Sequence, residues 1–206
     1  MFLDDAQLSS VLGTLLEPSK DLPALVSSLS GRSFSSYPEL IDAAIAQVQS
    51  WDSTSRAEFI RTGHSRIGET NEKNLSALSA TEQGASPTAA PTPPEVLARL
   101  AHLNDCYERR YPGLRYITFV NGRSRAAVAL ELEDVLGFPH SVSPDQPPVE
   151  TISPMGPDTE AWKTELDRAV VDVGRIAKSR LGSLTVAESR YAIMFFRVWK
   201  VERNSR

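Results

Sequence analysis

The chain has 206 residues, of which 41% are hydrophobic and 23% are charged, as expected for a single globular domain with a buried core. Its formal net charge of −4, without a basic patch, argues against a nucleic-acid partner. The one cysteine, Cys106, excludes an intrachain disulfide and a cysteine-rich zinc site, and no apolar run reaches the roughly 20 residues of a membrane span.

The first part of the chain predicts four helices. Apolar residues recur every three or four positions in three segments, 4–16, 22–29 and 38–51. Ser55 and Glu58 have the spacing of a capping box, which predicts a short fourth helix that ends at Gly63.

His64 directly follows the predicted end of this fourth helix, in a polar turn between Gly63 and Gly68. Because the helix dipole favours positive charge at a C-terminus, we expect a protonated imidazole there. The other histidines, His102 and His140, fit solvated positions. The spacing of the three histidines matches no metal-binding motif, so we expect no metal site.

A long helix and one extended segment follow in the second half. Thr92 and Glu95 have capping-box spacing and predict a helix that ends before Pro112. The run LRYITFV at 114–120 favours extended backbone, but a single strand cannot form a sheet. We therefore expect it to pack as an extended segment among helices.

Two more helices are predicted towards the C-terminus. One opens at Ser124 and stops at Gly137, and the next is capped by Asp158 and ends with Gly182 at C′. Cys106 lies on an apolar helical pattern and is expected in the core.

The predicted fold class is all-α: a single compact domain of about seven to nine helices with one extended segment. We place this domain at 1–182, with proline-rich loops at 84–94 and 138–157. A C-terminal extension, 183–206, follows, and its Tyr191–Val201 run is strongly apolar.

Four sequence segments, in this order, resemble one known family. They are GHSRIGE at 63–69, SATEQ at 79–83, LNDCYERRYPGLRYITFVNGRS at 103–124 and RIAKSRL at 175–181. Together they are similar to the OHCU decarboxylases over about residues 8–182. The resemblance depends on the combination, because no single segment is specific.

The resemblance implies an all-α enzyme that needs no cofactor and no metal. Such enzymes decarboxylate 2-oxo-4-hydroxy-4-carboxy-5-ureidoimidazoline (OHCU) to (S)-allantoin in urate degradation. It also implies a homodimer and a small-molecule substrate, and relatives are often peroxisomal. The charge and the lack of a long apolar run argue separately against a nucleic-acid or membrane partner, so we expect a cytoplasmic or peroxisomal location.

The resemblance also assigns site residues. The family's catalytic histidine falls on His64, the acidic residue of its S-x-x-E-Q motif on Glu82, and its late arginine on Arg180. The implied substrate contacts are Ser65, Ser79, Gln83, Ile117, Thr118, Phe119 and Val120. Ser65 departs from the family, which usually has proline after the histidine, and a serine loosens the turn and adds a hydroxyl.

These side chains suit a decarboxylation. The guanidinium of Arg180 can bind a carboxylate through two parallel hydrogen bonds. His64 can move a proton near neutral pH, and Gln83 offers a donor and an acceptor to a ureido group.

Each residue also has a structural interpretation when it is taken alone. His64 fits a surface turn, Ser79 and Glu82 fit a capping box, and Arg180 fits the last turn of a helix, where the dipole favours a cation. Two other functions remain open: a non-catalytic helical dimerisation module of the same fold, and a hydrolase of ureido compounds that uses His64 as a base.

Overall fold

The computed structural model describes residues 1–69, 91–141 and 143–203, with side chains described as far as residue 184. Within these ranges the protein has seven α-helices, one short 3₁₀ helix and no β-strand, which confirms the predicted all-α class. The elements are α1 (Asp5–Leu16), α2 (Leu22–Leu29), α3 (Tyr37–Gln49), α4 (Ser53–Gly63), α6 (Pro94–Arg110), α7 (Arg125–Leu136), η2 (Val149–Thr151) and α8 (Glu160–Arg203).

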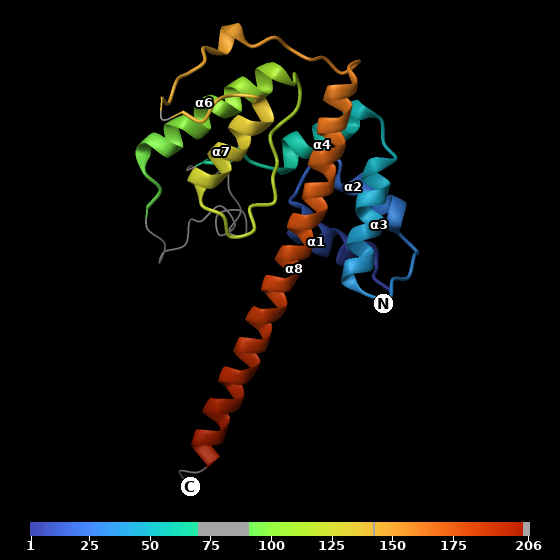
Figure 1. Cartoon of the computed structure of the whole chain (residues 1–206). Helices are drawn as coiled ribbons and strands as arrows, with labels where there is room; N and C mark the ends of the chain where they lie inside the picture. Colours follow the sequence, from blue (N-terminus) through green and yellow to red (C-terminus); the bar gives the residue numbers. More distant parts are fainter. Residues whose placement is uncertain (70–90, 142, 204–206) are drawn as a thin grey trace.

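Helix α8 organises the domain (Figure 1). It contacts α1, α3 and α4, while α6 and α7 pack against each other and η2 lies on α6. The backbone of the C-terminal half of α8 extends away from the other helices (Figure 1). None of the described helices has both the length and the apolar character needed to cross a lipid bilayer.

Most of the predicted helices begin where the sequence supplies a side-chain cap. At α1 the Asp4 carboxylate accepts from the Gln7 backbone N–H at 2.8 Å, and the Gln7 side chain accepts from the Asp4 N–H at 3.0 Å. Ser124 caps α7, and Gly137 ends it in the left-handed conformation, as predicted.

The predicted start of α4 was wrong. The helix begins at Ser53, and Asp52 is its N-cap: the Asp52 carboxylate accepts from the Ser55 backbone N–H at 3.0 Å and from the Ser55 hydroxyl at 2.7 Å. A carboxylate is a stronger acceptor than a hydroxyl, so the earlier residue takes the capping position.

Two other predicted caps do not form. Helix α6 does start at Pro94, but the Thr92 hydroxyl accepts from Arg125 at 3.3 Å and does not cap it. At the start of α8 the backbone N–H of Trp162 donates to the Thr159 hydroxyl at 3.3 Å, where Asp158 was predicted to be the cap.

The predicted helix end at Gly182 was also wrong. Helix α8 continues through this residue to Arg203, and the φ angle of Gly182 is not in the left-handed region. Leu181 and Leu184 on either side pack against the core, so burial of their side chains favours continuing the helix. The expected domain boundary therefore falls inside α8.

The segment 114–120 has no helix or strand, and its trace runs extended between α6 and α7, as predicted (Figure 1). Leu114, Tyr116 and Ile117 are buried, and the Tyr116 ring lies edge-on to Tyr107 of α6, with 5.3 Å between ring centroids. Cys106 is fully buried in the same core, again as predicted. The apolar side chains hold this segment between α6 and the other helices without any strand pairing.

Two glycines of α8 are expected to respond in opposite ways to substitution by alanine. A Cβ at Gly174 would lie 3.0 Å from Ile45 of α3, so Gly174→Ala should lower the free energy of unfolding by about 1 kcal/mol or more. A Cβ at Gly182 meets nothing within 4 Å, so Gly182→Ala should raise it by about 0.5–1 kcal/mol through helix propensity. Urea denaturation measures both, and a destabilised Gly182→Ala protein would mean that the helix ends there.

Candidate active site

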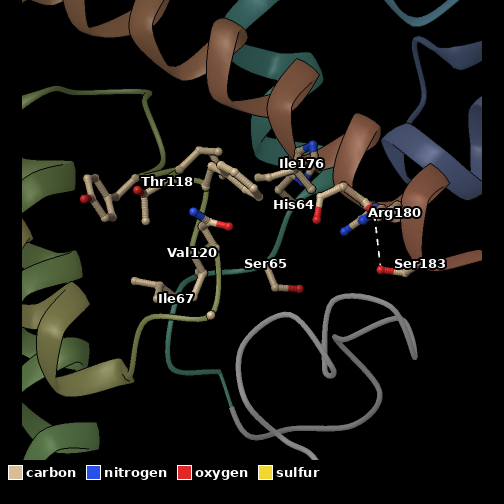
Figure 2. A pocket seen from close by; sticks show the side chains of 14 residues that line it. His64, Ser65, Ile67, Thr118, Val120, Ile176, Arg180 and Ser183 are labelled. Atoms are coloured by element: carbon tan, nitrogen blue, oxygen red, sulfur yellow. Dashed lines mark hydrogen bonds between the residues drawn. The ribbon is translucent and has the colours of Figure 1, made fainter. Parts of the chain in front are cut away.

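A cavity of about 290 Å³ lies between the turn after α4, the extended segment and α8 (Figure 2). Of the site residues predicted from the sequence, seven line it: His64, Ser65, Ile117, Thr118, Phe119, Val120 and Arg180. The remaining three, Ser79, Glu82 and Gln83, lie outside the described residues. Three distant parts of the chain therefore contribute the described predicted residues to one cavity.

The turn that carries His64 is held by the backbone and by one arginine. The His64 N–H donates to Ile60 O at 3.0 Å and closes the end of α4. The His64 carbonyl accepts from Arg115 Nη1 at 2.6 Å, and the same nitrogen donates to Arg61 O at 3.0 Å. Arg115, just ahead of Tyr116 in the extended segment, thus ties the turn to the opposite wall of the cavity.

His64 is neutral in the folded protein. Only 7% of its surface is exposed, and burial lowers its pKa from 6.5 to about 3, helped by the positive charges of Arg180 and Arg115. The expectation of an imidazolium was therefore wrong, because the helix dipole is weaker than desolvation and two nearby guanidinium groups. His64 Nε2 is buried and has no hydrogen-bond partner among the described residues.

The low pKa of His64 makes stability depend on pH. Between about pH 3 and pH 6.5 the unfolded chain binds a proton at this residue that the folded protein does not. Stability is therefore fully present above pH 6.5 and is lost as the pH falls, by at most about 1.4 kcal/mol per pH unit. Urea denaturation of wild type and His64→Asn across this range should show a shallower slope for the variant, and equal slopes would contradict the assignment.

Arg180 is the buried cation of the cavity. It is 2% exposed, and Nη1 lies 2.9 Å from Glu17 Oε1 and donates to Leu15 O at 3.3 Å. These contacts join α8 to the C-terminal end of α1. The guanidinium is therefore fixed at the cavity wall, close enough to His64 to lower the histidine's pKa.

One arginine binds the last two carbonyl groups of the extended segment. Arg123 donates to Phe119 O at 2.6 Å through Nη2 and to Val120 O at 2.9 Å through Nε. Its Nη2 also donates to the Thr118 hydroxyl at 3.0 Å, and that hydroxyl donates to Glu131 at 2.9 Å. In the described part of the chain, no hydrogen bond uses the backbone N–H groups of 117–120 as donors. The N–H groups of this segment are therefore candidate donors to a ligand, while the carbonyl groups of Phe119 and Val120 accept from Arg123.

Several residues at the site escaped the sequence analysis. Ile176, Ser179 and Ser183 line the cavity beside Arg180, and their spacing of three and four residues on one helix face could have identified them. No sequence spacing could have identified Glu17, because its partner Arg180 lies at the other end of the chain.

The described residues contain no group of three histidine, cysteine or acidic side chains close enough together to hold a metal ion. The cavity presents instead a guanidinium and a neutral imidazole beside a segment whose N–H groups make no hydrogen bond within the described ranges. Such a set of groups suits a small, oxygen-rich anion. The guanidinium supplies a positive charge and hydrogen-bond donors, and the backbone N–H groups supply further donors.

A comparison with known protein families found a match. The family model described as OHCU decarboxylase matches residues 2–138, a range that contains His64 and the extended segment. Arg180 lies beyond the matched range, and no curated protein matches the chain. Because the match covers more than half of the sequence, the chain belongs to the OHCU decarboxylase family.

Proposed function

We propose that this protein decarboxylates OHCU to (S)-allantoin without a cofactor. The single observation that carries the proposal is that His64 and Arg180, far apart in the sequence, line one cavity. The membership of the chain in the OHCU decarboxylase family supports a role in urate degradation and indicates the reaction class.

Arg180 binds the substrate carboxylate. Its guanidinium is buried at the cavity wall, where the low dielectric strengthens its attraction for an anion. The contacts with Glu17 and Leu15 keep it in one orientation, so little conformational entropy is lost on binding.

His64 holds and moves the proton. It begins as a neutral imidazole, so Nε2 can accept the proton of the substrate hydroxyl. A carboxylate bound at Arg180 offsets one of the positive charges that lower the pKa of His64. Substrate binding therefore raises the pKa of His64 towards the range in which it can exchange protons near neutral pH.

In the reaction, the bond between the ring carbon and the carboxylate breaks and CO2 leaves. The electron pair enters the ring, where the N–H groups of 117–120 can stabilise the developing negative charge. His64 returns a proton to one face of the neighbouring ring carbon, which sets the S configuration. Overall, the substrate anion takes up one proton from solvent and gives CO2 and neutral allantoin.

Circular dichroism at the allantoin band tests the proposal. OHCU is generated in situ by oxidising and hydrolysing urate, and its spontaneous decay gives racemic allantoin without a signal. An active protein should build a chiral signal. Ammonia or a ring-opened acid would favour a ureido hydrolase, and no signal from the folded protein would favour the helical module.

Other parts of the proposal come from the resemblance alone. Glu82 is proposed to orient His64 or bind a substrate amide, and Ser79 and Gln83 to contact the substrate. Homodimer formation and a cytoplasmic or peroxisomal location likewise remain predictions, which sedimentation and imaging of a tagged chain would check.

A further inference from the structure

We propose that Glu17 is a positioning residue for Arg180, which it orients at the cavity wall and whose positive charge it moderates. The inference rests on the proposed function in one respect, namely that Arg180 receives the substrate carboxylate. Glu17 does not itself line the cavity, whereas Arg180 does, so Glu17 acts through the arginine.

The backbone of Glu17 adopts a conformation that is strained for a residue other than glycine. Glu17 directly follows α1 with φ 70° and ψ 151°, a region that glycine occupies easily and other residues at a cost of about 1–3 kcal/mol. Such strained residues cluster at functional sites, where surrounding contacts hold them in place. A glycine here would relieve the strain but remove the carboxylate.

Glu17 forms an ion pair with Arg180. Its Oε1 lies 2.9 Å from Arg180 Nη1, and both side chains are buried, with 9% and 2% exposed. The Leu15 carbonyl accepts from the same nitrogen at 3.3 Å. The end of α1 therefore holds one side of the guanidinium and fixes the direction in which the group faces.

The charge of Glu17 has a separate consequence for the reaction. A carboxylate bound at Arg180 is attracted by the guanidinium and repelled by Glu17 behind it. When the carboxylate becomes CO2, the negative charge moves away from the Arg180 guanidinium and into the substrate ring. An arginine without its partner would therefore stabilise the bound substrate more than the transition state, and the chemical step would become slower.

A second buried ion pair provides a matched control. Arg99 Nη2 lies 2.6 Å from Glu133 Oε1, and these side chains are 6% and 1% exposed. Neither residue lines the cavity. Glu133→Gln therefore removes one charge from an equally buried pair away from the site.

The test compares Glu17→Gln, Glu17→Ala and Glu133→Gln with wild type. OHCU turnover gives KM and kcat, and calorimetric titration with hydantoin-5-acetate, a stable ring carboxylate, gives a Kd without catalysis. In Glu17→Gln the new amide oxygen can still accept from Arg180, so this variant should lower KM, Kd and kcat by about 10-fold each and leave kcat/KM nearly unchanged. Glu17→Ala loses the orientation and should raise KM and Kd.

Glu133→Gln should lower the melting temperature without changing KM, kcat or Kd. If Glu17→Gln behaves like Glu133→Gln, the inference is overturned. If wild type does not turn over OHCU but its Kd for hydantoin-5-acetate responds to Glu17→Gln, the proposed function fails and the role of Glu17 stands. If wild type neither turns over OHCU nor binds the probe, both proposals fail. Should Glu17→Ala not fold, the isosteric Glu17→Gln protein decides alone.

Discussion

Replacing His64 with asparagine is expected to lower kcat by about 100-fold or more, which is the usual contribution of a positioned acid–base group. The buried imidazole lines the cavity, and its Nε2 has no hydrogen-bond partner among the described residues. This nitrogen can therefore exchange a proton with a bound substrate. Asparagine can occupy a similar volume and form hydrogen bonds, but it cannot take up a proton near neutral pH.

The variant is expected to stay folded. The hydrogen bonds that fix the turn use the backbone N–H and carbonyl of residue 64, and a side-chain substitution leaves both in place. His140→Asn is the matched control, because His140 is exposed, pairs with Asp134 and does not line the cavity. Turnover near the wild-type value for His64→Asn, measured by the chiral allantoin signal, would remove His64 from the mechanism.

Local sequence patterns were enough to predict most of the fold. Apolar residues recur at helical spacing in α1, α2 and α3, and glycine or proline follows α1, α2 and α7 within two residues. The extended segment was also predictable, since β-branched and aromatic residues without a pairing partner leave few alternatives. The errors lie at helix ends, where two neighbouring residues compete for one cap, as Asp52 and Ser55 do.

The failure at Gly182 has a different cause. A glycine after a run of helical residues fits a helix end locally, but Leu181 and Leu184 pack on the core and α8 continues past Gly182. Tertiary burial thus overrides a local signal that costs about 1 kcal/mol. The local sequence pattern does not show which helix residues will pack against other elements of the fold.

The charge state of His64 could not be predicted from the sequence either. Helix-end position favours the imidazolium, and the sequence showed only that position. The two guanidinium groups that lower the pKa of His64 belong to Arg115 and Arg180, which other elements bring close. Glu17 was missed for the same reason, because its ion pair with Arg180 joins residues that lie far apart in the sequence.

Arg180→Lys is expected to lower kcat/KM by about 10- to 100-fold, with most of the loss in KM. Lysine keeps the positive charge, but a single ammonium cannot pair with Glu17 and also present a planar donor pair to a carboxylate. Lysine keeps the charge and loses only the paired hydrogen bonds, which hold the two carboxylate oxygens in place both before and during bond breaking. The loss should therefore appear mainly in KM, and kcat should change less.

Arg99→Lys is the matched control for this substitution, since it replaces a buried arginine whose carboxylate partner, Glu133, lies outside the cavity. Both variants should lose stability in urea, because each leaves a buried carboxylate with fewer hydrogen bonds. Only Arg180→Lys should raise KM for OHCU and Kd for hydantoin-5-acetate. An equal loss of turnover in both variants would show that Arg180 supports the fold and not the substrate, whereas a selective rise in KM assigns the carboxylate to this guanidinium.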